Sequence, residues 1–360
     1  MADSVAEQIA ALKDEDWAIR EEAAAALGSS RDTRAVIPLV AALRDPDRAV
    51  RDAAIAALTT IGEASVPALA GCLADRDLTL QESAASILAV IADARVVDPL
   101  IASLDSPDWI VRMHAAKALG RIGDPKAVKP LLPLLQDKVK AVRVEAANGL
   151  ALLGKAAVPL LVEALKHHDW LVRLHAVEAL GRIKSPESVE PLLRVLFNDR
   201  DTAVRVDAAR SLGEIGDARA VEFLVTAMTD LDVRPQAVEA LGKIGDRRAV
   251  PSLVAVVTGS SRPAESRPLD GCGDRWDQEM VAMEAAVKAL AQIRDEATIP
   301  VLVAALQNTV TRAEAAAALG AFGPPAIPFL LDVLKKERDE NILFHAKGTL
   351  AQLGWRPNRM

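Results

Sequence analysis

Apolar residues follow one another along this chain at helical spacing, in a pattern that returns again and again. The segment DWIVRMHAAKALGRIGDPKAVKPLLPLL, which begins at Asp108, has a close counterpart in DWLVRLHAVEALGRIKSPESVEPLLRVL, which begins at Asp169. In both copies the apolar residues lie three and four positions apart, as on one face of an amphipathic helix. Each copy holds two such helices, so the pattern predicts two-helix repeats.

One arginine, or a residue that replaces it, marks the same place in eleven copies of the pattern. These positions are Arg20, Arg51, Gln81, Arg112, Arg143, Arg173, Arg205, Arg234, Met283, Arg312 and Leu343. Nine of the ten spacings between them run from 29 to 32 residues, and one is 49. Such a period is typical of repeat proteins. We therefore expect an all-α fold, a right-handed α-α superhelix with about eleven two-helix repeats, as a single solenoid over residues 1–360.

The ends of the helices carry recognisable signals. The first helix of a repeat has an early proline such as Pro130, where the missing N–H costs little. The second helix follows an aspartate such as Asp108, which can cap free N–H groups. Many second helices end in Gly-Asp, as at Gly123 and Asp124, where glycine supplies the left-handed cap and aspartate starts the next helix.

The second helix divides into a buried and an outward face. On a helical wheel, Val111, Ala115 and Leu119 cluster on one side, together with the recurring arginine. A partly buried arginine needs a charged partner. Its recurrence with an aspartate four residues earlier predicts a ladder of arginine and aspartate side chains between neighbouring repeats.

The consensus D-x-x-VR-x-x-AA-x-ALG-x-IGD-x-x-AV-x-PL resembles the HEAT-like repeats of the phycobilisome lyase (PBS lyase) family, and it extends over nearly the whole chain. This resemblance implies a HEAT-repeat fold. The same kind of repeat occurs in phycobilin lyases of the E/F type, in deoxyhypusine hydroxylase, in HEAT-type DNA glycosylases and in many scaffold proteins. The repeat therefore leaves the function open between a protein-binding scaffold and an enzyme.

Two enzymatic relatives fit the sequence poorly. The di-iron site of deoxyhypusine hydroxylase needs His-Glu dipeptides, and this sequence has none; His175 with Glu178 one turn later is the nearest approach. A DNA glycosylase needs a basic face and aromatic residues, but the chain lacks tyrosine. We expect no catalytic residues, no metal and no cofactor. The main alternative to a scaffold is a lyase or chaperone for a tetrapyrrole-bearing protein, of the E/F phycobilin lyase kind.

The net charge of −7 and the pI near 5.4 argue against a nucleic-acid partner. No apolar run reaches the roughly 18 residues that a membrane span requires, and the N-terminal sequence has no signal-peptide pattern. Two cysteines 200 residues apart, Cys72 and Cys272, form no metal motif and no disulfide framework. We expect a cytoplasmic monomer whose partner is a protein.

Solenoids bind partners along the face that the second helices line. On the wheel, the positions two before and two, five and nine after the arginine point outward. They are mostly small in repeats one to three and become large and charged from repeat four onward. Aromatic residues and arginine are enriched at binding hot spots. The predicted partner-binding ridge comprises Trp109, His114, Lys117, Arg121, Glu145, Trp170, His175, Glu178, Arg182 and Arg210. The alternative for Trp109 and Trp170 is that they only fill gaps between repeats.

The period breaks once, in repeat nine. Residues 258–278, TGSSRPAESRPLDGCGDRWDQ, are rich in Gly, Ser, Pro and Asp and predict an inserted loop. Loops of this length in a compact array are often functional. Cys272 and Trp276 are its candidate anchors, and a tolerated insertion without a role is the alternative.

Overall fold

The computed structural model describes the backbone of residues 4–259 and 273–355, and all of their side chains except those of residues 273–277. These described ranges contain α-helices and short 3-10 helices and no β-strand. The all-α prediction is therefore confirmed for this part of the chain.

The helices follow one another in pairs, as the period predicts. The first twelve are α1 (Ser4–Ala11), α2 (Trp17–Ser30), α3 (Val36–Ala42), α4 (Arg48–Ile61), α5 (Val66–Cys72), α6 (Leu78–Ile91), α7 (Val97–Ser103), α8 (Trp109–Ile122), α9 (Val128–Leu131), α10 (Lys140–Leu152), α11 (Val158–Ala164) and α12 (Trp170–Ile183). The remaining ten are α13 (Val189–Asn198), α14 (Thr202–Ile215), α15 (Val221–Ala227), α16 (Arg234–Ile244), α17 (Val250–Val257), α18 (Gly273–Ile293), α19 (Ile299–Ala305), α20 (Arg312–Phe322), α21 (Ile327–Lys336) and α22 (Glu340–Gln352). A 3-10 segment, η5 (Leu132–Gln136), continues α9.

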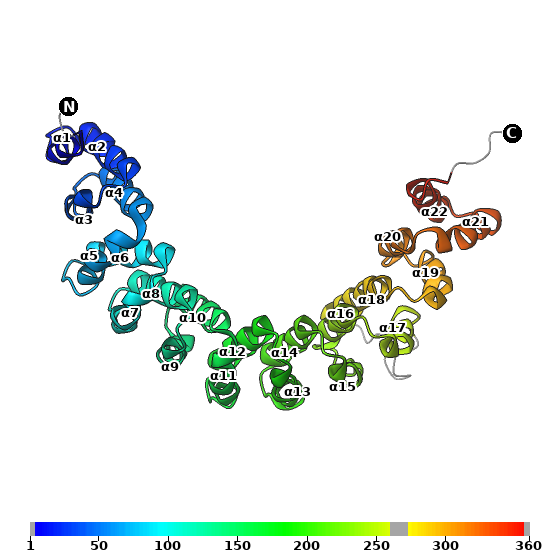
Figure 1. Ribbon diagram of the computed structural model, residues 1–360. Helices are drawn as coiled ribbons and strands as arrows, with labels where there is room; N and C mark the ends of the chain where they lie inside the picture. The colour runs from blue at the N-terminus through cyan, green and yellow to red at the C-terminus, as the bar shows by residue number, and fades with distance from the viewer. Residues whose placement is uncertain (1–3, 260–272, 356–360) are drawn as a thin grey trace. The chain divides into compact units, whose positions relative to one another are not determined.

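The chain forms two compact units, Met1–Ala179 and Leu180–Met360, and the boundary falls inside α12. The single solenoid over residues 1–360 remains a prediction. Within each unit the even-numbered helices form one layer and the odd-numbered helices the other (Figure 1). The even-numbered layer, which contains the second helix of every repeat, lies on the concave side of the unit's bend.

Small residues let successive second helices approach closely. The contact is made by equivalent positions in each pair of repeats. For example, Gly28, eight residues after Arg20, faces Ala57, six residues after Arg51. A β-carbon built on Gly28 would lie 2.8 Å from the Ala57 Cβ atom, and one on Gly213 would lie 2.8 Å from the Ala240 Cβ atom. Since a β-carbon does not fit at such distances, glycine brings the second helices together, while the first helices are spread apart (Figure 1).

The predicted caps are present. Asp16, Asp47 and Asp108 each accept a hydrogen bond from the backbone N–H two residues later, at the start of a second helix. Gly123 ends α8 in the left-handed region with φ of 77°, and the following Asp124 accepts from the N–H of Lys126. These bonds satisfy helix-end groups that have no partner within the helix.

Each repeat buries its apolar stripe between its own two helices and the next pair. Val111, Ala115 and Leu119 are fully buried in α8, as the wheel predicts. The first helix contributes leucines such as Leu100 and Leu131 to the same core. Because each pair packs on its neighbours, the core runs continuously through each unit.

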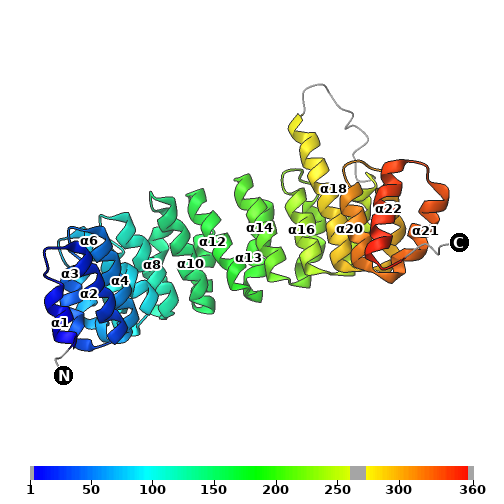
Figure 2. The ribbon, with the colours of Figure 1, turned by 90° about the horizontal axis from the view of Figure 1, so that it is seen from above.

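The inserted segment of repeat nine differs from its prediction at one end. The expected loop reached residue 278, but α18 already begins at Gly273 and runs for 21 residues, compared with 11 in α16 and 11 in α20. Figure 2 shows α18 extending beyond these neighbours. Residues 274–279, DRWDQE, are mostly polar, and no further glycine or proline occurs before the helix ends, so nothing in this sequence interrupts a helix. Residues 260–272 lie outside the described ranges.

Within the described residues, Arg48–Cys72 is long and apolar enough for one membrane-spanning helix, with a mean hydropathy of 1.4. The pair Lys140–Leu152 and Gly154–Ala164 meets the same criterion only if its bend of 116° is ignored. Core helices can pass this test as well, so two such stretches are weak evidence for a membrane. Arg48–Cys72 comprises α4 and α5, whose Val50, Leu58 and Leu69 are buried in the repeat core.

Candidate functional site

The recurring arginine joins neighbouring repeats, but with a different aspartate from the expected one. Arg20 Nε donates to Asp45 Oδ2 at 2.8 Å, and Arg112 Nε donates to Asp137 Oδ2 at 2.8 Å. In both pairs the carboxylate lies 25 residues after the arginine, in the loop that precedes the next second helix. The aspartate four residues before the arginine caps its own helix instead. The predicted link between repeats is therefore present at Arg20, Arg112 and Arg205, with this correction of partner. The other described arginines at this position for which bonds are given, Arg51, Arg143, Arg234 and Arg312, bond to backbone carbonyls of the loop before their own helix.

The guanidinium of Arg112 also forms hydrogen bonds within its own repeat. Arg112 Nη1 donates to the backbone carbonyls of Ser106 at 2.8 Å and Pro107 at 3.2 Å, in the loop before its helix. The side chains of Arg112 and Asp137 are only 16% and 11% exposed. The hydrogen bond from Arg20 holds the pKa of the Asp45 carboxyl below its usual value. Each such ion pair ties one second helix to the loop before the next second helix.

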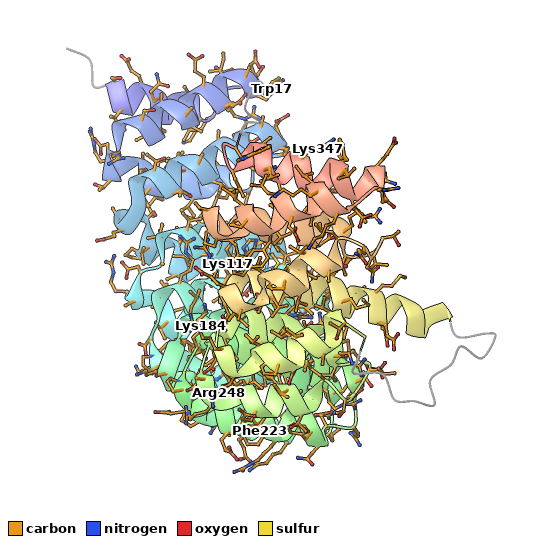
Figure 3. All side chains as sticks on the ribbon, turned by 90° about the vertical axis from the view of Figure 1, so that its right-hand side faces the viewer. Trp17, Lys117, Lys184, Phe223, Arg248 and Lys347 are labelled. Carbon is orange, nitrogen blue, oxygen red and sulfur yellow. The ribbon has the colours of Figure 1, made fainter. Side chains whose placement is uncertain are left out.

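On α8 the candidate ridge is exposed. The indole of Trp109 is 41% exposed, and Lys117 and Arg121 project from the surface of the concave layer. Figure 3 labels Lys117 among the side chains of the first unit. Arg121 Nη1 donates to the Ala89 carbonyl of α6 at 2.9 Å, which holds the guanidinium across the boundary between two repeats.

The position two residues after the arginine is more buried than the wheel predicts. His175 was expected to project to solvent, but its side chain is buried, with 5% exposed. The corresponding Ser83 and Asp207 are also buried, while His114 and Glu145 are half-buried. The physical reason is the close approach of the second helices, because each covers this position on its neighbour. The outward face is therefore narrower and consists mainly of the positions five and nine after the arginine.

The two histidines of the ridge have different surroundings. His175 Nδ1 lies 2.8 Å from Glu178 Oε2, one turn later on the same helix, while its Nε2 is buried without a partner. His114 Nδ1 is also buried without a partner. Burial lowers the pKa of His114, and the nearby Lys117 lowers it further. The neutral imidazole is therefore favoured at His114.

In the second unit, Arg182 and Arg210 are exposed. Arg210 Nη1 forms an ion pair with Asp207 Oδ1, so its charge is partly compensated within its own helix. These two arginines belong to another unit than Lys117 and Arg121. In the first unit, Trp170 is as exposed as Trp109, and Glu178 is half-buried.

Two further predictions concern the cysteines and the insertion. Cys72 is buried in α5 as expected, and its thiol donates to the Ala68 carbonyl at 3.3 Å. Burial raises the pKa of this thiol. Cys272 and the side chain of Trp276 lie outside the described part of the chain. Among the described residues, no three His, Cys, Asp or Glu side chains are grouped so that they could hold a metal ion.

A second set of links between repeats was not predicted from the sequence. In the motif Asp-x-Arg at the start of several first helices, aspartate caps the 3-10 turn and pairs with the arginine two residues later. Arg95 pairs with Asp93 at 2.6 Å and also donates to the Glu63 carbonyl of the preceding repeat at 3.1 Å. The hydrogen bonds from Arg95 lower the pKa of Asp93 to about 2. The recurrence of D-x-R at Asp32, Asp93, Asp217 and Asp246 is the signal that would have revealed it.

Comparison with known proteins settles the family. The sequence pattern of HEAT repeats matches residues 5–89, 66–146, 128–201, 189–265 and 277–351. The chain belongs to the HEAT-repeat family. No curated protein matches the sequence of this HEAT-repeat chain.

Several solved karyopherin structures share the HEAT-repeat fold. Kap95p in a structure with RanGDP has a TM-score of 0.66 and 16% identity, covering 97% of this chain and 57% of Kap95p. Kap121p bound to the extreme C-terminus of Cdc14p has a TM-score of 0.64 and 13% identity, covering 97% of this chain and 45% of Kap121p. The chain thus spans about half the length of these proteins, and at these identities the likeness shows the fold alone.

The narrower resemblance to phycobilisome lyases remains a prediction. The CpcE–CpcF complex of phycocyanin lyase from Nostoc is 26% identical over 63% of this chain and 94% of the matched chain. Its TM-score of 0.36 is too low for an argument about fold or function.

Proposed function

We propose that this HEAT-repeat chain is a scaffold that binds a partner protein on the concave layer of its second helices. The observation that carries the proposal is the surface of α8 and α10 in the first unit, which exposes Trp109, Lys117, Arg121 and Leu152. We call these four residues the α8–α10 surface. Leu152 is 62% exposed, although it belongs to a helix whose other leucine, Leu150, is fully buried.

The α8–α10 surface combines the kinds of side chain that protein interfaces use. Tryptophan and arginine carry much of the binding energy in many interfaces, and exposed apolar residues around them exclude water. The bond from Arg121 to the Ala89 carbonyl holds this guanidinium before any partner arrives. A side chain that is already ordered loses less conformational entropy on binding.

The charges around this surface have both signs. Lys117 and Arg121 are exposed, and the half-buried Glu145 of α10 lies in the neighbouring helix of the same layer. Such a surface favours a partner protein of mixed charge over a polyanion, and complementary charges then govern specificity and association rate. The karyopherin structures support the proposal at the level of fold, since they include Kap95p with RanGDP, Kap95 with Nup1 and Kap121p with the C-terminus of Cdc14p.

The second unit offers its own exposed arginines, Arg182 and Arg210, on its own layer of even-numbered helices. We propose that they contact a partner independently of the α8–α10 surface. The ion pair with Asp207 makes Arg210 the weaker contributor.

The test is affinity capture with the full chain as bait, followed by binding measurements on the captured protein. The variant Lys117→Glu with Arg121→Glu should weaken binding by at least about tenfold, because one desolvated charged contact is worth roughly 1.5–3 kcal/mol. Lys13→Glu with Lys155→Glu is the matched control, since it changes two exposed lysines elsewhere in the same unit by the same charge.

Both double variants should keep the wild-type melting temperature, because surface substitutions usually change stability by less than about 0.5 kcal/mol. Equal binding by the α8 variant and the wild type would exclude this surface. If both variants weakened partner binding equally, only the net charge of the protein would matter. That result would also count against binding at the α8–α10 surface.

A further inference from the structure

Successive second helices stack in a constant register. Gly213, eight residues after the recurring arginine of its repeat, faces Ala240, six residues after the arginine of the next repeat. About one turn earlier on two other neighbouring helices, Lys288 of α18 forms an ion pair with Glu314 of α20 at 3.9 Å. Lys288 lies five residues after the position of the arginine, and Glu314 lies two residues after it. These contacts show that successive second helices run in the same direction.

Each second helix therefore has two contact stripes. The stripe toward the next repeat holds the positions one, four and eight after the arginine. The stripe toward the preceding repeat holds the position just before the arginine and the positions two and six after it. Both stripes step by three and then four residues, so each lies on one side of its helix. In the common register, position one faces the position before the next arginine, position four faces position two, and position eight faces position six.

The stripe of α2 toward a preceding repeat is uncovered. Ile19, just before the arginine, is 42% exposed, whereas the residue in this place is at most 6% exposed in each of the ten other repeats. Glu22 is exposed and Ala26 is half-buried, although the equivalents of Ala26 are buried in all the other repeats. We call Ile19, Glu22 and Ala26 the α2 end stripe.

The stripe of α22 toward a next repeat is uncovered as well. Phe344 is 74% exposed, the largest value among the exposed large apolar side chains of the described residues. Lys347 and Ala351 are exposed, and Figure 3 labels Lys347. The place of Lys347 is held by alanine, valine or isoleucine in the other repeats, where it is buried or half-buried. Solenoid ends usually present a polar face to water, so an exposed phenylalanine here indicates a contact. We call Phe344, Lys347 and Ala351 the α22 end stripe.

The two end stripes match each other in the register of the interior repeats. Phe344 would face Ile19, which pairs two large apolar side chains. Lys347 would face Glu22, which pairs opposite charges as Lys288 and Glu314 do. Ala351 would face Ala26, which pairs two small residues where the helices approach most closely. Among the described residues neither Lys347 nor Glu22 forms an ion pair, so both charges are available to a second copy of the chain.

We propose that the chain binds a second copy of itself head to tail, with the α22 end stripe of one copy against the α2 end stripe of the other. This contact uses a different surface on each copy, so each added copy offers a further free end unless the assembly closes into a ring. The monomer predicted from the sequence is then the form at low concentration. The contact does not use the α8–α10 surface, so its failure would leave the proposed scaffold function standing.

The experiment is sedimentation velocity of the full chain over a wide range of protein concentration. The wild type should form species larger than the monomer as its concentration rises. Lys347→Glu brings two glutamates together and should weaken this association by at least about tenfold, since like charges across an interface repel strongly. Lys243→Glu is the matched control, because it makes the same change at an exposed lysine of α16 outside both end stripes. It should associate like the wild type.

A mixture of two variants tests whether the contact is head to tail. Glu22→Lys alone should associate as poorly as Lys347→Glu, because it brings two lysines together. An equimolar mixture of these two proteins should associate again, since every contact between unlike copies pairs a lysine with a glutamate. The double variant Glu22→Lys with Lys347→Glu should associate on its own for the same reason.

Phe344→Ser tests the apolar part of the contact and should weaken association without changing the net charge. Because this side chain is exposed, the melting temperature in dilute solution should not change. The proposal is overturned if the wild type stays monomeric at every concentration, as it would if another part of the chain covered the end stripes. It is also overturned if Lys347→Glu or Phe344→Ser associates like the wild type, if Lys243→Glu weakens association as much as Lys347→Glu, or if the mixture stays monomeric.

Discussion

A β-carbon on Gly120 would lie 2.4 Å from the Cα atom of Gly149, so α8 and α10 touch through their backbones at this point. Gly120→Ala should therefore push the two helices apart and cost about 1–3 kcal/mol of unfolding free energy, as overpacking of a core does. Urea denaturation of both proteins measures this cost.

The matched control is Gly71→Ala in α5, where a β-carbon would meet nothing within 4 Å. This substitution should stabilise the protein by up to about 1 kcal/mol, because alanine is the better helix former. A Gly120→Ala protein as stable as the wild type would mean that the second helices can separate freely.

The ion pair between Arg112 and Asp137 should respond unequally to single and double substitution. Asp137→Asn leaves a partly buried guanidinium without its carboxylate and should cost about 1–3 kcal/mol. Arg112→Met together with Asp137→Leu removes both charges and should cost less than the sum of the single changes. Strict additivity in this double-mutant cycle would show that the two side chains do not interact.

Acidification should weaken the fold through His114. Burial and the nearby Lys117 lower the pKa of His114 below its ordinary value of 6.5, so the unfolded chain binds a proton more readily than the folded one. The stabilisation from the neutral imidazole is complete above about pH 6.5 and is lost as pH falls through the folded pKa. His114→Asn should therefore lose less stability on acidification than the wild type.

NMR titration of the histidine ring gives a direct measurement. Lys117→Met should raise the pKa of His114, whereas Lys126→Met, which changes an exposed lysine outside α8, should leave it unchanged. Equal effects of both substitutions would exclude a specific influence of Lys117.

The thiol of Cys72 should react slowly with alkylating reagents. Burial is the main cause of its raised pKa, with the carboxylate of Asp75 acting in the same direction, so little thiolate forms. In a Cys272→Ser protein, iodoacetamide should label Cys72 only after unfolding, as mass spectrometry can show. Rapid labelling of the folded protein would mean that α5 opens readily.

The repeat pattern predicts the fold well because it encodes local physics. Proline, capping aspartate and terminal glycine each act within one turn of helix, so Pro130, Asp108 and Gly123 place helix ends without reference to the rest of the chain. The identity of the aspartate that pairs with Arg112 is different. It depends on how two repeats stack, and the nearer Asp108 was the wrong choice because its carboxylate is used by the helix cap.

In the candidate site too, features that depend on one helix were predicted, and features that depend on the stacking of repeats were not. A helical wheel of one isolated helix places His175 outward, but the neighbouring second helix covers it. Burial at this position depends on the distance between repeats, which the small residues at Gly181 and Ser211 set elsewhere in the array. Lys117 and Arg121 were placed correctly on the surface because they lie further from the line of contact. Their role in binding remains a prediction.

Equivalent positions in successive repeats make equivalent contacts, so a gene of this kind can lose a whole repeat. If residues 112–142 were excised and Val111 joined to Arg143, Arg143 would stand six residues after Ser106, whose carbonyl already accepts from an arginine at that place. Gly149 would then face Ala89 across the new junction. Because each repeat meets only its neighbours, the shortened chain should close with compatible contacts. Whole repeats, rather than single residues, are thus the units by which this protein can gain or lose length while keeping its fold.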